Sequence, residues 1–465
     1  MNIFQVLKEL GYEKVDPSPY TKMDVWRSWY VGDVEDFHKY KVFNGTAYVE
    51  TRRYTTGMAK KVCEDWASLL LNEKVAITLE GEKEQTFVDD VLNNANFRIK
   101  GSELQEQTAA LGTGAIVPRI TGATSGADGT VSGGAIKLDY VRAEKIFPLT
   151  WENGIITECA FSSSRNLSND KKKYTYVQIH HLVDGKYDID NLLFLDSNGN
   201  LEPVGLDTVD GFQNIPPVIH TQSDKPQYVI DRYNITNNAD MDSPMGISVF
   251  ANAIDQLKGV DIAYDSYVNE FILGKKRIFV MPEFTKTVDG KPVFDPNDTV
   301  YYVMPGDGEG TGVQQVDMTL RTTEHNSGIQ DMLNVLSAKV GFGENHYQFD
   351  RGSITTATQI ISENSSLYRT IKKHEIILEK MLIDLCRIIL RLGNQYLNAG
   401  LNEDVEISVD FDDSIIEDKA TERQQDRQDV AMGAMNMYEY RMKWYNEDEE
   451  TAKKALPKME ALISE

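Results

Sequence analysis

The sequence has few cysteines and lacks any long hydrophobic run. Cys63, Cys159 and Cys386 are its only cysteines, and their odd number and wide spacing argue against a disulfide framework or a zinc cluster. No apolar run approaches the roughly 18 to 20 residues that a membrane-spanning helix needs, so we expect no membrane partner. Residues 1–5 lack the basic start and apolar centre of a signal peptide, which predicts synthesis in the cytoplasm.

Basic residues are also scarce relative to acidic ones. Lys and Arg total 48 against 72 for Asp and Glu, a net charge of −24. Tight non-specific binding to nucleic acid depends on basic side chains that release phosphate counterions, so the chain should not hold nucleic acid tightly. An acidic balance can equally serve solubility alone. At 465 residues the chain exceeds the roughly 250 to 300 residues of a single core, which predicts two or more lobes.

The glycine-rich motifs lack the residues that would make them cofactor sites. Residues 129–134 have the glycine spacing of a phosphate-binding loop, but Ala135 and Ile136 stand where Lys and Ser or Thr would contact phosphate and magnesium. Residues 111–117 fail the dinucleotide fingerprint because Val117 replaces the third glycine. We therefore expect no nucleotide or other cofactor.

Two further clusters of polar residues are better explained by structure than by chemistry. Asp196, Asn198 and Asn200 resemble the start of a calcium loop, but their spacing fits a hairpin turn. His180 and His181 are adjacent in a strand pattern, so they point to opposite faces and cannot chelate one metal. The sequence predicts no catalytic residue and no metal site.

Hydrophobic periodicity predicts a mixture of helices and strands, that is, an α+β fold. A mainly helical pattern from residue 5 to about residue 100 is followed by a glycine-rich loop at 111–135 and a β-rich stretch at 135–221. Further along, a helix beginning at Ser243 and a helix at 322–340 flank short strands at 278–316.

The strongest single pattern is a long helix from Ile354 to Asn398. Apolar residues recur there at spacings of three and four with no proline, and Gly400 could end the helix. At about 1.5 Å per residue, this helix would be roughly 67 Å long. Such a helix usually spans an assembly, and its apolar stripe is longer than one chain of this size should need.

Two blocks of the sequence resemble tailed-bacteriophage portal proteins of the siphophage type. The first block resembles their tunnel loop and spine helix, and it comprises Gly343–Asp350, Thr355–Thr358 and Ser362–Ser365. The second resembles their wing, and it comprises Trp26, Trp29, Tyr30, Gly32, Phe37–Tyr40, Arg53, Met58–Lys61 and Asp65–Glu73. The resemblance covers most of the chain and is looser at about 122–240 and after residue 412.

The resemblance implies a portal fold built from successive parts and assembled as a ring. Those parts would be a wing at 1–242, with a helical N-terminal portion and a β-rich lobe, a first stem helix at 243–277, a clip at 278–318, a second stem helix at 319–340, a tunnel loop at 341–353, a spine helix and wing strand at 354–410, and a helical crown at 411–465.

The resemblance also implies a function. Portal proteins form a dodecameric ring at the unique vertex of the capsid, within the virion. Double-stranded DNA passes through the ring without sequence recognition during packaging and ejection, and is retained between them. The implied partners are the terminase large subunit, a head-completion or adaptor protein at the head-tail junction, and the major capsid and scaffolding proteins. The chain itself would not be an enzyme.

Two groups of residues would face DNA. The tunnel-loop group is Phe342, Gly343, Glu344, Asn345, His346, Tyr347, Gln348, Phe349, Asp350 and Arg351, whose aromatic rings could touch a moving duplex without reading its sequence. The second group, Lys275, Lys276 and Arg277, could form a basic belt. Alternatively, the first group is a helix connection within a core, and the second is a solvated cluster at a helix end.

Two other functions remain open from sequence alone. One is a different virion connector or adaptor protein. The other is a hydrolase that acts on DNA or glycan, because Asp410, Asp412 and Asp413 follow a predicted strand as nuclease carboxylates sometimes do.

Overall fold

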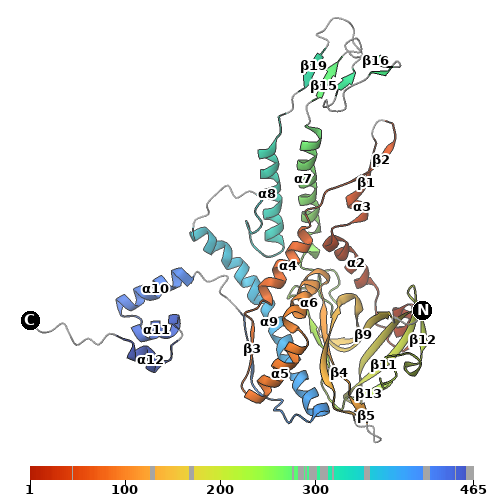
Figure 1. Cartoon of the computed structure of the whole chain (residues 1–465), viewed down its shortest axis with the longest axis vertical. Helices are drawn as coiled ribbons and strands as arrows, with labels where there is room; N and C mark the ends of the chain where they lie inside the picture. The colour runs from red at the N-terminus through yellow and green to blue at the C-terminus, as the bar shows by residue number, and fades with distance from the viewer. Residues whose placement is uncertain are drawn as a thin grey trace, which may run out of the picture. The chain divides into compact units, whose positions relative to one another are not determined.

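The computed structural model describes most of the chain in two compact units, Met1–Val409 and Asp410–Glu465 (Figure 1). The described residues are 1–43, 46–125, 131–166, 172–274, 277–280, 287–288, 291–292, 301–303, 313–316, 319–349, 357–411, 419–445 and 447–456. They combine helices with sheets, so the predicted α+β class is confirmed.

The first 111 residues are mainly helical, as predicted, but a hairpin interrupts them. The helices are α1 Ile3–Glu9, α2 Ser18–Val31, α3 Glu35–His38, α4 Met58–Leu70, α5 Glu82–Asn94 and α6 Phe97–Leu111. Strands β1 Lys39–Phe43 and β2 Tyr48–Arg52 pair antiparallel between α3 and α4, and they form a two-stranded sheet. This hairpin was not predicted from the sequence.

The β-rich stretch folds into antiparallel sheets. The strands of the larger sheet are β8 Ile146–Glu152, β9 Ile155–Asn166, β10 Lys173–Val183, β11 Lys186–Ser197, β12 Asn200–Val204 and β13 Val218–His220. Their order in the sheet is β12-β11-β10-β9-β8, and β13 pairs with β11. Helix α1 packs on it through Val6 and Leu7, which join Phe147 and Val177 in one buried cluster. The N-terminus thereby covers the β-rich lobe.

Part of the segment predicted as a loop at 111–135 is instead a strand of a second sheet. Strand β4 Gly114–Thr121 pairs with β7 Ala135–Arg142 and β14 Val229–Asp231, and its first five residues are buried. The loop is therefore shorter than predicted. Only the short strands β5 Thr124–Ser125 and β6 Val131–Ser132 lie between β4 and β7 among the described residues, and the predicted loop's residues 126–130 lie outside them.

The helix predicted to begin at Ser243 begins later, as α7 Ile254–Leu273. Residues 245–250 instead lie against the end of α6. The backbone N–H of Val249 donates to the carbonyl oxygen of Ala109 over 2.9 Å, and an added Cβ at Gly246 would overlap the carbonyl oxygen of Gly112. This close backbone approach holds the segment in a non-helical conformation that helical periodicity could not reveal.

After α7 the chain forms short strands and then returns to helix. The described strands are β15 Arg277–Val280, β16 Thr287–Val288, β17 Lys291–Pro292, β18 Tyr301–Val303 and β19 Val313–Val316, with β15 between β18 and β19. Helix α8 Thr322–Lys339 then packs against α7. The predicted order of helix, short strands and helix is confirmed.

The predicted long helix is present as α9 Ala357–Leu397, 41 residues with a length of roughly 60 Å. Its end lies earlier than Gly400, because Asn398 already has a left-handed φ of 51°. The expectation that its apolar stripe exceeds the needs of one chain is wrong for most of the stripe where side chains are described, although Tyr368 is 36% exposed. The stripe residues buried within this chain are Leu367, Ile371, Leu378, Met381, Leu382, Leu385, Ile388, Ile389, Leu392 and Tyr396.

The second unit contains three described helices, α10 Lys419–Met432, α11 Met437–Tyr445 and α12 Glu449–Lys454. Tyr440 is central to it. Its hydroxyl oxygen accepts hydrogen bonds of 3.0 Å from Nε of both Arg423 and Arg427, which lowers the pKa of Tyr440 despite the opposing effect of burial. These hydrogen bonds join α10 to α11.

Candidate functional site

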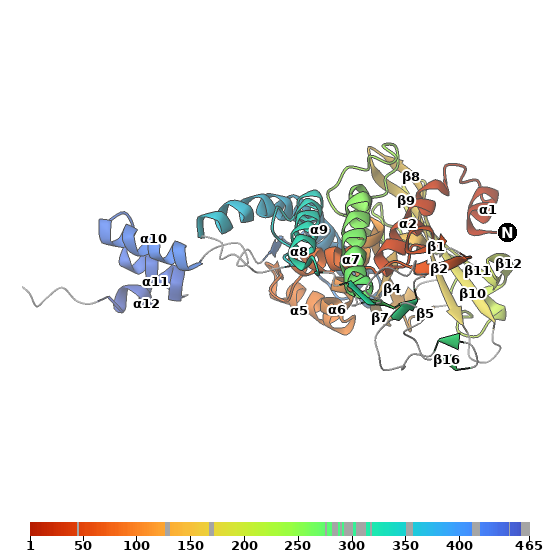
Figure 2. The same ribbon diagram turned by 90° about the horizontal axis from the view of Figure 1, so that it is seen from above.

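Helices α7 and α8 lie side by side along their lengths (Figures 1 and 2). Small residues on α7 permit the close contact: a Cβ on Gly259 would lie 3.3 Å from Sδ of Met332, and one on Gly274 would lie 2.6 Å from Cδ2 of Leu320. The two helices, called the helix pair below, lead to and from strands β15–β19. The helix pair therefore connects these strands to the rest of the first unit.

A salt bridge closes the strand end of the helix pair. Arg321 donates from Nε and Nη2 to the two carboxylate oxygens of Glu270, over 3.1 and 2.7 Å. These hydrogen bonds, with a further one from the Arg321 backbone, lower the pKa of Glu270 to about 2. The two-pronged geometry fixes the start of α8 relative to the end of α7.

Two buried carboxylates fasten the opposite face of α7 to the N-terminal residues. Asp261 Oδ1 accepts hydrogen bonds from the backbone N–H of Thr56 at 2.7 Å and from its hydroxyl at 2.8 Å, while Asp265 Oδ1 accepts from the backbone N–H of Tyr54 at 3.0 Å. His38 completes the network. Its Nδ1 accepts from the N–H of Val34, so Nε2 carries the proton and donates to Asp261 Oδ2 over 3.1 Å.

The segment that follows α8 is fastened by aromatic rings. Phe342 stacks on Trp66 of α4, with ring centroids 4.6 Å apart, and on His346, with centroids 4.3 Å apart. Trp66 also donates from Nε1 to the carbonyl oxygen of Val340 over 3.1 Å. We call Trp66, Phe342 and His346 the aromatic stack. It packs residues 341–346 against α4, more than 270 residues away in sequence.

Hydrogen bonds continue this attachment to residue 349. The hydroxyl of Tyr347 donates to Asp65 Oδ2 over 3.0 Å, and Gln330 of α8 donates to the carbonyl oxygen of Tyr347 and accepts from the N–H of Phe349. The expectation that the aromatic residues of this segment are exposed is therefore wrong for Phe342 and Tyr347, which are 3% and 8% exposed. Their physical partners, Trp66 and Asp65, are far away in sequence.

The remaining predicted site residues have different placements. Phe349 is 41% exposed, and Glu344 and Gln348 are also exposed. Gly343 and Asn345 have left-handed φ values of 87° and 63°, which turn the backbone. Asp350, Arg351, Lys275 and Lys276 lie outside the described residues, and Arg277 is the first residue of β15.

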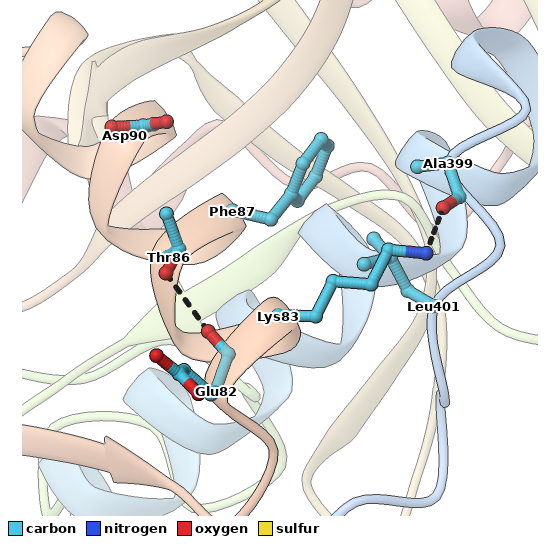
Figure 3. A pocket seen from close by; sticks show the side chains of 7 residues that line it. All are labelled: Glu82, Lys83, Thr86, Phe87, Asp90, Ala399 and Leu401. Atoms are coloured by element: carbon cyan, nitrogen blue, oxygen red, sulfur yellow. Dashed lines mark hydrogen bonds between the residues drawn. The ribbon is translucent and has the colours of Figure 1, made fainter.

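A hollow of about 450 Å³ lies between α5 and the residues that follow α9 (Figure 3). Glu82, Lys83, Thr86, Phe87, Asp90, Ala399 and Leu401 line it. Lys83 donates from Nζ to the carbonyl oxygens of Ala399 at 2.6 Å and Gly400 at 2.8 Å. Carbonyls at a helix end commonly need such a donor, so this lysine closes the C-terminal end of α9.

The polar clusters weighed from sequence have structural roles. His180 is buried in β10, while its neighbour His181 is partly exposed and lies 3.1 Å from Asp190, in keeping with opposite faces. Asp196 accepts from the N–H of Gly199 over 2.7 Å in the predicted hairpin turn between β11 and β12. Cys63, Cys159 and Cys386 are buried free thiols.

Within the described part of the chain, no group of three or more His, Cys, Asp or Glu side chains is arranged to hold a metal ion. Among the same residues, no helix is long and apolar enough to cross a membrane. Of the three carboxylates considered for a hydrolase, Asp410 ends strand β20 Ile407–Asp410, while Asp412 and Asp413 lie outside the described residues.

A family model described as phage portal protein, SPP1 Gp6-like, matches residues 12–461. This chain belongs to that family of portal proteins. The match spans nearly the whole chain, including the regions where the sequence resemblance was looser. It favours a portal over the connector and hydrolase alternatives, and portal proteins are structural components rather than enzymes.

Solved structures similar to this portal-family chain come from gene transfer agent particles. One is described as the neck of a native particle computed with C12 symmetry, at 12% identity and a TM-score of 0.36, covering 83% of this chain and 88% of that chain. Another is described as the virion of a native particle, at 13% identity and a TM-score of 0.37, covering 94% and 97%. TM-scores this low support no inference about this chain. Among proteins of curated function, none matches it significantly.

Sequence reasoning missed the buried network on α7 of this portal protein, although a signal for it exists. Asp261 and Asp265 are four residues apart and lie on the same helical face as the buried Leu257. Acidic residues within an apolar stripe require polar partners. The partners themselves, at residues 38, 54 and 56, could not be identified from spacing.

Proposed function

We propose that this portal-family chain forms a ring-shaped channel at one vertex of a phage capsid, through which double-stranded DNA is packaged, retained and ejected. The observation that carries the proposal is the family match over residues 12–461. We assign to each part of the chain the role that the corresponding part has in the family. We propose that the ring contains twelve copies.

The described elements fit these roles in chain order. Residues 1–242 are proposed as the wing, with α7 within the first stem helix at 243–277 and α8 within the second at 319–340. The strands between them belong to the proposed clip at 278–318, where the terminase large subunit and later a head-completion or adaptor protein would dock. Helix α9 is the proposed spine, and residues 411–465 the crown. The wing would face the major capsid and scaffolding proteins.

The burial pattern refines the proposed tunnel loop at 341–353. Phe342 and Tyr347 are fastened within the chain, so they would set the position of the loop and would not touch DNA. The exposed Glu344, Gln348 and Phe349 remain candidates for contact with DNA, together with Asp350 and Arg351. The basic belt of Lys275, Lys276 and Arg277 also remains a proposal.

The acidic composition is compatible with a channel through which DNA slides. A net charge of −24 per chain is multiplied in a ring, and phosphate would be repelled more than gripped. DNA sliding through the channel would then form few strong ion pairs between its phosphates and the protein. The purified protein should accordingly bind DNA weakly and lose that binding as salt is raised.

Electron microscopy of the purified full-length chain tests the proposal. Negatively stained particles should show rings with a central hole, and mass photometry should give one oligomeric mass close to that of a dodecamer. A chain that remains monomeric over micromolar concentrations and a range of salt would contradict the proposed function.

A further inference from the structure

The β1–β2 hairpin carries large apolar side chains that the described residues of its own chain leave exposed. Val42, Phe43, Tyr48 and Val49 are 43%, 56%, 73% and 44% exposed, respectively. The cross-strand pairs Val42–Val49 and Phe43–Tyr48 are successive, so they lie on opposite faces of the hairpin. Both faces of the hairpin therefore present apolar surface to solvent.

A hairpin of this kind is marginal by itself. The two strands form a sheet of their own and pair with no other described strand. Isolated two-stranded hairpins are marginally stable in water, and exposed apolar strands invite association with another chain. Covering by a partner would stabilise the hairpin and remove its apolar surface from solvent.

The hairpin is also basic in an acidic chain. Residues 39–52 contain three basic side chains and one acidic one, a net charge of +2 where the whole chain carries −24. Lys39 lies directly opposite Arg52, and like charges at opposed positions disfavour strand pairing. An acidic surface that also has apolar residues would complement it.

The helix pair offers such a surface at its strand end. Phe271, Ile272 and Leu320 are exposed large apolar residues at this end of the pair. Glu324 and Asp331 are exposed on α8, and their spacing of seven residues places them on one helical face. Apolar and acidic residues thus follow one another in the direction from Leu320 along α8.

The geometry of one chain suits contact between successive copies. In both views α7 lies between α8 and the hairpin (Figures 1 and 2), so α8 and the hairpin lie on opposite sides of α7. A contact between different surfaces of successive copies is head-to-tail, and such contacts form a ring where the rotation from one copy to the next closes. The His38–Asp261 contact at the hairpin's base keeps the hairpin beside α7.

We propose that the hairpin of each copy docks on the α8 flank of the helix pair of the next copy, with Phe43 and Tyr48 against Leu320, and Arg52 against Glu324 and Asp331. This inference rests on the proposed ring and identifies one of its interfaces. The hairpin then acts as an arm that links adjacent subunits.

Disulfide trapping in the full-length protein tests the contact. The native thiols Cys63, Cys159 and Cys386 are fully buried, so cysteines introduced by Phe43→Cys and Leu320→Cys would be the reactive ones. Disulfides require Cβ atoms within about 4.5 Å, so a short bismaleimide should be used alongside the oxidant. The expected result is a ladder of covalent oligomers that extends to the full ring on a denaturing gel.

Matched controls separate the contact from random collision. Ile155→Cys, at an exposed position of β9, combined with Leu320→Cys should give no ladder. Arg52→Glu should raise the concentration needed for half-maximal ring formation by about tenfold, and adding Asp331→Arg should restore most of it.

The outcomes distinguish the inference from the function on which it rests. Intact rings whose engineered thiols react with a maleimide but give no ladder would overturn the hairpin contact and leave the portal ring standing. Absence of rings from the unmodified protein would overturn the proposed function, and the hairpin contact with it.

Discussion

Residues 341–349 and the hairpin at 39–52 are both rich in aromatic residues, yet one segment is covered and the other is not. Phe342 is sandwiched between Trp66 and His346, whereas Phe43 and Tyr48 touch chiefly each other, with ring centroids 5.4 Å apart. The difference lies in the neighbours, since α4 supplies Trp66 and Asp65 to the first segment. The first segment is covered within one chain, and the second would be covered only in the proposed ring.

Removing one aromatic ring from each segment should give the largest contrast. Phe342→Ala should lower the free energy of unfolding by about 3–5 kcal/mol, because it empties the middle of the aromatic stack. Phe43→Ala should change the stability of the isolated chain by less than about 0.5 kcal/mol, because its ring is exposed. Urea unfolding of both variants measures these changes. Equal losses of stability would contradict the difference in burial between the two segments.

Acid should loosen the first segment and spare the second. His374 of α9 contacts the Trp66 ring edge-on at 4.9 Å, and burial lowers its pKa to about 3. The unfolded chain takes up this proton near pH 6.5, so stability is full above that pH and is lost as the pH falls towards 3. At pH 4.5 the loss should be roughly 2–3 kcal/mol.

Hydrogen exchange at pH 7 and pH 4.5 measures this difference directly. Amides of residues 341–349 should lose protection in acid by more than those of the hairpin. In His374→Asn, whose amide oxygen can replace Nδ1 as acceptor for the N–H of Asn234, the share of the acid sensitivity due to His374 should disappear. The share due to His346, whose pKa is also lowered by burial, should remain. If the variant is as sensitive to acid as the unmodified protein, protonation of His374 is not the cause.

A backbone substitution at Gly341 should have a smaller effect. Its φ is +95°, and an added Cβ would lie 3.0 Å from Cγ2 of Thr370 and 3.3 Å from the Trp66 ring. Gly341→Ala should therefore cost about 1–3 kcal/mol. Gly11→Ala is a matched control, since that glycine has a φ of +96° with nothing near its Cβ position. The difference between the two variants in thermal unfolding isolates the packing contribution.

The smallest change removes only a hydroxyl. Tyr347→Phe breaks the hydrogen bond to Asp65, which also accepts from Lys61, so the loss should be about 0.5–1.5 kcal/mol. Rings should still form in this variant. Failure to assemble would show that residues 341–349 lie at a subunit interface, and the contrast with the hairpin would then be wrong.

Local patterns predicted the helices well, and long-range contacts explain where they failed. Apolar spacing located α8 and α9 to within a few residues, because each helix buries apolar residues along one face. The start of α7 was misplaced because Gly246 packs on Gly112, a contact between distant backbones. The hairpin was missed because its strands are only five residues each and one face mixes charged residues with Phe43 and Tyr48, which weakens the alternation of a half-buried strand.

The candidate site was predictable in position but not in burial. The glycines and aromatic residues at 341–349 marked the segment correctly as a turn between two helices. Whether Phe342 faces solvent depended on Trp66, which no local pattern connects to it. Spacing along one element therefore identified the segment, and contacts between elements determined which residues remain available to a ligand.

The carboxylates of Asp261 and Asp265 have a mechanical consequence. They tie α7 to the backbone at residues 54 and 56, immediately after the hairpin, through short hydrogen bonds. Helix and hairpin must therefore tilt together as one rigid body. In the proposed ring, a tilt of α7 in one subunit would displace the hairpin seated on its neighbour, so that a local movement at the clip would propagate around the whole circumference.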